Sequence, residues 1–260
     1  MNKILEVENL SIAFQQYYQN TKQRYIKPVK DLSIEIKEAE IMAIVGASGS
    51  GKSLLAHAIL GVLPSNSEIK GVMKYRGNAI TKADIEKMRG NKIRYIPQSV
   101  KYLDPTMKVG KQLKINLKNK TKEEILEKLK QFSLDKEIYD YYPHQLSGGM
   151  LRRILFLSCL TEHTELIIAD EPTPGVHPEI LEELLQSFLS FKEKGISVIF
   201  ITHDMKAALK IADRVATFKE GKVIDISYPS DILNGNPNLN DYVKKLWNSQ
   251  PSNRFLEEVK

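Results

Sequence analysis

The chain has 260 residues, the length of one large domain or two modest ones. Hydrophobic residues make up 42% and charged residues 27%, enough for a core with an ordinary charge content. The single cysteine, Cys159, excludes an internal disulfide or a cysteine-ligated cluster within one chain, and fits a reducing compartment.

The net charge of +6 is compatible with a nucleic-acid or membrane surface, but the lysines are scattered and are interpreted as solvated faces. No apolar run approaches the roughly 18 residues of a membrane span. The N-terminus is charged and lacks the apolar core of a signal peptide. We therefore expect a soluble chain that reaches a membrane only through a partner.

The N-terminal part predicts two strands joined by a loop. Strand-forming residues run through 4–14, and residues 32–37 alternate between apolar and polar, as a half-buried strand does. Residues 15–27, between them, are polar and rich in tyrosine and predict a loop.

The next stretch fits the pattern G-x-x-x-x-G-K-[ST] with Gly46, Ala47, Ser48, Gly49, Ser50, Gly51, Lys52 and Ser53. Residues 41–45 read as a buried parallel strand, and residues 54–60 as a helix. This context favours a phosphate-binding loop over a glycine- and serine-rich turn. Inward N–H groups and the helix N-terminus attract phosphate. Lys52 is expected at the β- and γ-phosphates, and the Ser53 hydroxyl on Mg²⁺.

Aromatic residues near the first loop are ordinary anchors, or one of them stacks on an adenine ring. The candidates are Phe14, Tyr17, Tyr18 and Tyr25. Phe14 is grouped with the nucleotide-binding residues.

The middle of the chain predicts a short strand and turn over residues 71–78, which makes a mixed sheet the expectation. Residues 93–96 predict another strand, followed by Gln98, an amide that without other evidence is usually a turn residue. Thr121 and Glu124 form a capping box before a helix with an apolar stripe. Residues from about 99 to 160 are therefore predicted to form an inserted helical subdomain.

A pair of adjacent glycines precedes the predicted helix over residues 151–160. Ser147 is suited to cap it, and Gly148 and Gly149 leave backbone N–H groups exposed, which is a second phosphate-binding geometry. Alone, the pattern fits an ordinary helix cap. Together with the phosphate loop, it is the most specific feature of the chain.

Residues 166–171 predict a buried strand that ends in two carboxylates, Asp170 and Glu171. Adjacent acids need a cation, a proton or solvent to offset their repulsion. Asp170 suits Mg²⁺, and Glu171 is placed to activate water as a general base; the alternative is a solvated strand end. Residues 180–191 predict a helix and 196–201 a strand that leads to His203, where a γ-phosphate contact is favoured over a structural role. Residues 215–226 predict a hairpin, and 230–260 a short tail.

Taken together, these residues resemble the ATP-binding subunit of an ABC transporter, in the family's order and spacing and over nearly the whole chain. The resemblance implies an α/β P-loop NTPase fold over residues 1–260, with a mixed sheet, an antiparallel β-subdomain and the helical insertion. It implies that Gln98 joins the Mg²⁺ and water network and relays movement to the membrane subunit. His203 would touch the γ-phosphate. Ser147, Gly148 and Gly149 would close on ATP held by the opposite subunit.

Within the family the chain is most similar to the peptide and nickel importers, through Met150 and residues 103–112. One departure concerns the loop after Glu171, which the family ends in an aspartate that bridges the dimer. This chain has His177 there. The change favours a heterodimer with a second ATPase subunit over a homodimer.

The implied function is ATP hydrolysis, with ATP and Mg²⁺ as cofactors, that powers import of nickel, another metal chelate or an oligopeptide. The implied partners are integral membrane permease subunits and, indirectly, an extracytoplasmic binding protein, at the cytoplasmic face of the membrane. A soluble P-loop switch or nucleotide kinase gives the Ser-Gly-Gly helix no role. A non-transport ABC ATPase acting on nucleic acid or ribosomes usually carries coiled coils or tandem ATPase units. This chain has neither, so no nucleic-acid partner is expected.

Overall fold

The computed structural model describes residues 2–18, 22–99, 102–118, 120–173 and 178–250. Within them the strands form two sheets. The antiparallel sheet contains, in spatial order, β2 (Lys22–Lys37), β1 (Lys3–Tyr18), β4 (Ser67–Tyr75) and β5 (Asn78–Ala79). The mixed sheet contains, in spatial order, β10 (Lys222–Ser227), β9 (Arg214–Lys219), β3 (Ile41–Gly46), β8 (Ser197–Ile201), β7 (Leu166–Asp170) and β6 (Ile93–Ile96).

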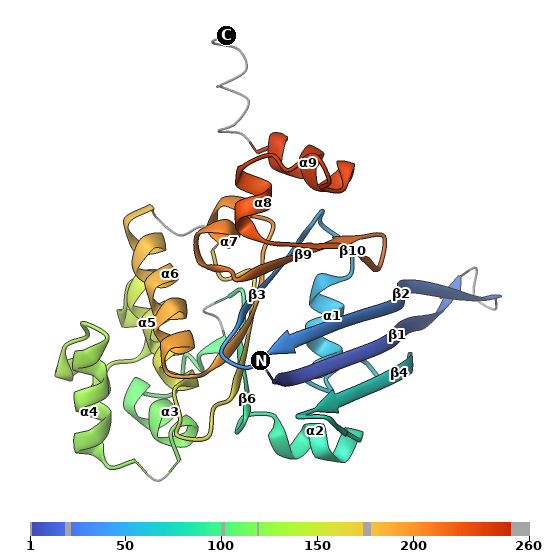
Figure 1. Ribbon diagram of the computed structural model, residues 1–260. Helices are drawn as coiled ribbons and strands as arrows, with labels where there is room; N and C mark the ends of the chain where they lie inside the picture. The colour runs from blue at the N-terminus through green and yellow to red at the C-terminus, as the bar shows by residue number, and fades with distance from the viewer. Residues whose placement is uncertain (1, 19–21, 100–101, 119, 174–177, 251–260) are drawn as a thin grey trace.

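The helices surround the mixed sheet. They are α1 (Lys52–Ile59), α2 (Lys82–Met88), α3 (Val109–Asn116), α4 (Lys122–Gln131), α5 (Gly148–Cys159), α6 (Pro178–Glu193), α7 (Met205–Ile211), α8 (Pro229–Leu233) and α9 (Asp241–Asn248). The antiparallel sheet lies on one side of the molecule, and α3 and α4 on the other (Figure 1). This is the predicted fold class, an α/β mixed sheet with an antiparallel sheet and a group of helices beside it.

Two local expectations for the first sheet need correction. Residues 15–18 and 22–27 are not a loop, because β1 and β2 continue there as a paired ribbon in which Gln15 faces Tyr25. Tyrosines and β-branched residues favour extended backbone, and a ribbon that extends beyond the core needs no apolar face. Residues 71–78 belong to the antiparallel sheet, whereas the antiparallel member of the mixed sheet is β10, paired with β9.

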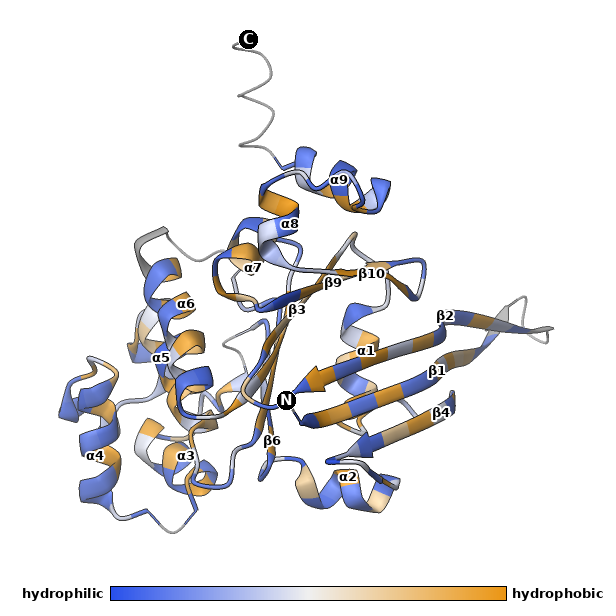
Figure 2. Cartoon of the chain, viewed as in Figure 1, coloured by the Kyte–Doolittle hydropathy of each residue, from blue (hydrophilic) through white to orange (hydrophobic). Residues whose placement is uncertain are grey.

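Strand β3 is the centre of the mixed sheet, paired in parallel with β8 and β9. Successive side chains point to opposite faces of a strand. Met42 and Ile44 join the cluster formed with α1 and the antiparallel sheet, whereas Ala43 and Val45 join the cluster formed with α7. All six residues of β3 are buried. Figure 2 shows apolar residues along this strand and polar residues on the outer surfaces of the helices.

The helices α3, α4 and α5 share an apolar core of their own. The Thr121 side chain accepts a hydrogen bond from Glu124 N, and Glu124 accepts one from Thr121 N, which confirms the capping box at α4. The C-terminal half of α5 contributes Phe156 and Cys159 to the core beneath the mixed sheet. Helix α5 therefore connects the helical group to the sheet.

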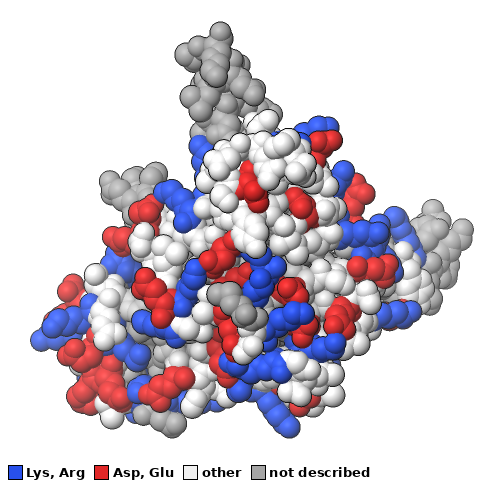
Figure 3. All heavy atoms as spheres, in the orientation of Figure 1, with Lys and Arg blue, Asp and Glu red and all other residues white. Residues whose placement is uncertain are grey.

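Basic and acidic side chains are interspersed over the face shown in Figure 3, as the scattered lysines predict. In the described part of the chain, no helix combines the length and apolar character that crossing a bilayer requires.

Candidate active site

The phosphate loop connects β3 to α1, as predicted. Gly51 has a φ of +103°, and a Cβ there would lie 3.2 Å from Val29 Cγ2, so the turn into α1 requires glycine. Ala47, Ser48 and Gly49 are exposed, whereas Ser50 and Lys52 are buried. Residues 47–49 of the loop therefore face solvent, whereas its C-terminal part is held in the interior.

The turn between β9 and β10 anchors this loop. Gly221 N donates to the Ser50 carbonyl at 3.1 Å, and the Gly221 carbonyl accepts from Lys30 N at 2.9 Å. A Cβ on Gly221 would lie 2.2 Å from the Pro28 carbonyl oxygen, so only glycine fits between β2 and the loop. The loop is thus hydrogen-bonded indirectly to both sheets.

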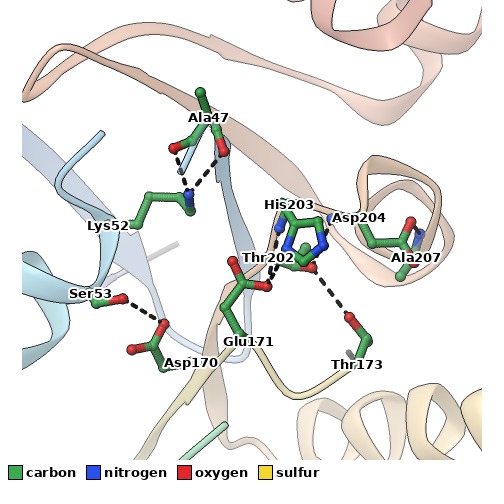
Figure 4. A network of polar contacts seen from close by, with 11 residues as sticks. Ala47, Lys52, Ser53, Asp170, Glu171, Thr173, Thr202, His203, Asp204 and Ala207 are labelled. Atoms are coloured by element: carbon green, nitrogen blue, oxygen red, sulfur yellow. Dashed lines mark hydrogen bonds and ion pairs between the residues drawn. The ribbon is translucent and has the colours of Figure 1, made fainter. Parts of the chain in front are cut away.

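Lys52 is a buried cation held by its own loop. Its Nζ donates to the Gly46 carbonyl at 2.9 Å and to the Ala47 carbonyl at 3.1 Å (Figure 4). Burial lowers the pKa of Lys52, and the carboxylates of Glu171 and Asp170 act in the opposite direction. Ser50 Oγ is buried without a hydrogen-bond partner among the described residues. A phosphate would supply both the anion and the acceptor that these groups need.

Ser53 and Asp170, 117 positions apart in the chain, meet at the carboxyl end of β7. Ser53 Oγ donates to Asp170 Oδ1 at 3.1 Å (Figure 4). Burial raises the pKa of Asp170, and the hydrogen bond from Ser53 opposes that shift. A hydroxyl and one carboxylate are an oxygen donor set that Mg²⁺ takes together with phosphate oxygens. Both residues therefore fit the predicted Mg²⁺ role.

Glu171 and His203 form the next contact along this edge of the sheet. Glu171 Oε2 lies 2.8 Å from His203 Nδ1, and His203 N donates to the same oxygen at 3.4 Å (Figure 4). Glu171 has a φ of +48°, a conformation that costs a non-glycine residue energy and is concentrated at functional sites. Its side chain is 16% exposed and that of His203 63% exposed. The carboxylate is held in position next to solvent.

The strand before Gln98 contributes a contact that the sequence did not predict. Tyr95, on β6, donates its hydroxyl to Asp170 Oδ2 at 3.4 Å. Gln98 itself is exposed and makes no hydrogen bond among the described residues. A tyrosine in an apolar strand reads as a core residue, and only the pairing of β6 with β7 reveals its second function.

The Ser-Gly-Gly segment begins α5. Ser147 Oγ accepts a hydrogen bond from Met150 N at 3.3 Å, which confirms the predicted N-cap. Gly148 is exposed, and Gly149 is half-buried. Within the described residues, no hydrogen bond joins these three residues to the phosphate loop of the same chain. They lie in the helical part of the fold.

The aromatic candidates for an adenine contact differ in exposure. Phe14 is partly buried and packs against the core cluster beneath the antiparallel sheet. Tyr25 is 62% exposed. It lies three residues before Pro28, and the Pro28 carbonyl is 3.3 Å from the Cβ position of Gly51. Tyr25 is therefore more accessible to solvent than Phe14. His177 lies outside the described residues.

Comparison with known proteins identifies the family. The model of the ABC transporter family matches residues 29–174. The oligopeptide transport ATP-binding protein OppD of Lactococcus lactis subsp. cremoris SK11 is 32% identical over 264 residues, covering 96% of this chain and 76% of OppD. The metal-staphylopine import ATP-binding protein CntD of Staphylococcus aureus NCTC 8325 is 32% identical over 219 residues, covering 79% of this chain and 81% of CntD. The ATP-binding cassette MJ0796, in a dimeric post-hydrolysis state bound to ADP and Pi, superposes with a TM-score of 0.74 at 24% identity, covering 87% of this chain and 99% of MJ0796.

The fold and the phosphate loop define a P-loop nucleotide-binding protein. The two-sheet architecture, the Ser-Gly-Gly helix and these matches narrow that class to one family. The chain belongs to the ABC transporter family, as an ATP-binding subunit.

Proposed function

We propose that this chain binds ATP with Mg²⁺ and hydrolyses it at the edge of the mixed sheet. One observation carries the proposal. Ser53 directly follows the buried Lys52 in the chain, and its hydroxyl lies 3.1 Å from the carboxylate of Asp170. A cation for the phosphates and oxygen ligands for a metal converge at that point.

Each residue has a defined task in this proposal. The amides of residues 46–51 and Lys52 Nζ bind the β- and γ-phosphates. Ser53, Asp170 and Gln98 would hold Mg²⁺, directly or through water, and the ion offsets phosphate charge when bound. The Glu171 carboxylate accepts the proton of the attacking water. The Nδ1 bond to Glu171 leaves His203 Nε2 to contact the γ-phosphate, with Tyr25 as the adenine platform.

The test is phosphate release from Mg²⁺–ATP by the chain assembled with its membrane partners. Activity should disappear with excess EDTA and return with added Mg²⁺. Ser53→Ala should raise the Mg²⁺ concentration needed for half-maximal activity. Full activity in EDTA would refute the metal assignment for Ser53 and Asp170.

We further propose that residues 1–260 act as one ATP-binding domain on the cytoplasmic face of a membrane, bound to integral permease subunits. The region around 99–160 is the helical subdomain; its separate apolar core supports this division. The residues Ser147, Gly148 and Gly149 would contact ATP held by a second ATPase subunit. The exposed position of Ser147 and Gly148 at the start of α5 supports an intermolecular contact.

The second ATPase is proposed to be a different chain, because His177 replaces the aspartate expected to bridge the dimer. Removing one carboxylate from a desolvated contact can cost a few kcal/mol. The mass of the Glu171→Gln chain in solution with ATP tests this. A monomer that dimerises only with a second ATPase supports the heterodimer. A stable ATP-dependent homodimer, with steady activity from the unmutated chain alone, contradicts it.

The transported substrate is proposed to be an oligopeptide or a metal chelate such as one of nickel, delivered by an extracytoplasmic binding protein. The names of OppD and CntD support these two classes. Uptake of labelled peptide and of labelled nickel, in cells with and without this gene, distinguishes them. Co-purification with ribosomes or DNA instead of membrane subunits would favour the alternative of a non-transport ATPase.

A further inference from the structure

A basic cavity of about 280 Å³ lies away from the phosphate loop. Its lining comes from the start of β6, the approach to β7 and the region from α3 to α4, including Arg94, Lys128 and Thr161. Residues 160–163 precede β7, whereas Asp170 ends it. Five strand residues at about 3.3 Å each span about 17 Å, so the lining residues 160–163 and Asp170 lie at opposite ends of β7.

Arg94 lines this cavity, and its guanidinium includes a buried donor that has no partner among the described residues. Its Nη2 donates to the Asn116 carbonyl at 2.9 Å. Its Nε is inaccessible to solvent and has no hydrogen-bond partner among the described residues. A buried N–H of a guanidinium without an acceptor is costly, and such groups in folded proteins call for an explanation.

Lys128 is a second cation of this lining, and it has no ion pair within the described part of the chain. It is half-buried on α4 and makes no hydrogen bond or ion pair with the described residues. Burial lowers the pKa of Lys128, and the positive charges of Lys120 and Lys194 lower it further, whereas the carboxylates of Glu162 and Glu124 act in the opposite direction. By contrast, Lys120 is paired at 3.0 Å with Glu124 and at 2.6 Å with Glu162.

The charges that line the cavity are unbalanced. Arg94, Lys118, Lys120 and Lys128 are opposed in the lining by the carboxylate of Glu162, and Lys120 already occupies that carboxylate. A monoanion would leave this excess largely in place, whereas a phosphate brings up to two charges and several acceptor oxygens. Those acceptors suit a guanidinium whose described hydrogen bond is limited to one carbonyl, and an ammonium without a partner among the described residues.

We propose that this cavity is a second anion site, which binds a phosphate-class oxyanion through the Arg94 guanidinium and Lys128 Nζ. The ligand is either free inorganic phosphate or the phosphate of a small monoester. The site is separate from the P-loop and does not depend on the proposed ATPase activity.

The experiment uses the full chain carrying Lys52→Ala, to weaken competing phosphate binding at the P-loop. Sodium phosphate is titrated calorimetrically at constant ionic strength. We expect saturable binding, which Lys128→Met weakens by about tenfold or more, since a charge-assisted hydrogen bond is lost. The matched control is Lys130→Met, on the same helix but exposed and outside the cavity lining; it should leave the affinity unchanged.

A second substitution protects the test against misfolding. Arg94→Lys keeps the charge but removes the guanidinium, and it should also weaken phosphate binding, with circular dichroism verifying the fold. Titration with AMP separates the sources: tight, Lys128-dependent binding of AMP indicates a monoester, and binding of inorganic phosphate alone indicates the free ion. The proposal is overturned if the Lys128→Met and Lys130→Met chains bind phosphate equally, if neither ligand binds saturably, or if acetate binds as tightly as phosphate.

Discussion

Replacing Glu171 by glutamine should separate ATP binding from ATP hydrolysis. In the structure the carboxylate is 2.8 Å from His203 Nδ1, and a glutamine amide oxygen can still accept a hydrogen bond from that nitrogen. The local geometry should therefore survive, while the group that accepts the proton of water is lost. A positioned general base contributes about 10²–10⁴-fold, which corresponds to about 2.7–5.4 kcal/mol of activation free energy.

The assay is single-turnover phosphate release by the assembled transporter, with ATP affinity measured in parallel by a fluorescent analogue. Turnover should fall by about 10²–10⁴-fold while affinity stays within about a factor of three. Glu127→Gln makes the same chemical change on the exposed surface of α4 and should alter neither quantity. Near-normal turnover in Glu171→Gln would refute the role of Glu171 as the base.

Three further substitutions, and one control at Phe14, test the site and the fold. Lys52→Ala should abolish nucleotide binding in the same titration, because the charge at the β- and γ-phosphates is lost; unchanged affinity would mean that backbone amides suffice. Tyr25→Ala should weaken ATP binding by about 5–150-fold, the value of a lost base–aromatic stack, whereas Phe14→Leu should leave it unchanged; the reverse result would restore Phe14 as the platform. Glu40→Ala should lower the free energy of unfolding by about 3–5 kcal/mol, because it leaves the partly buried cation of Arg214 without its carboxylate partner. In the structure Arg214 Nε donates to Glu40 at 2.5 Å. An unchanged midpoint of urea denaturation would contradict this prediction.

Much of this site was predictable because its motifs lie at strand ends. Parallel strands β3, β7 and β8 end at one edge of the sheet, so a phosphate loop, two carboxylates and a histidine that follow them must come together. The contact between Ser53 and Asp170 follows from that rule. The sequence pattern shows which residues follow strands, and the parallel pairing of those strands brings these residues to one edge of the sheet.

The contacts that were not predictable depend on pairing between distant segments. Tyr95 reaches Asp170 only because β6 lies next to β7, and nothing in residues 93–96 specifies that neighbour. The ribbon beyond residue 14 was not predicted, because a strand that does not pack against the core has no alternation of apolar and polar residues. The orphaned Nε of Arg94 is likewise visible only once packing has closed around it.

The contact of Gly221 with the phosphate loop limits how far the chain can be shortened. The family match at residues 29–174 contains the loop and both carboxylates, but it excludes β8 and β9, the two strands that flank β3. A fragment with those bounds would expose both edges of its central strand and would tend to aggregate. It would also lack the glycine that hydrogen-bonds Ser50. Any truncated version that still holds phosphate must therefore extend at least through the hairpin that ends at Ser227.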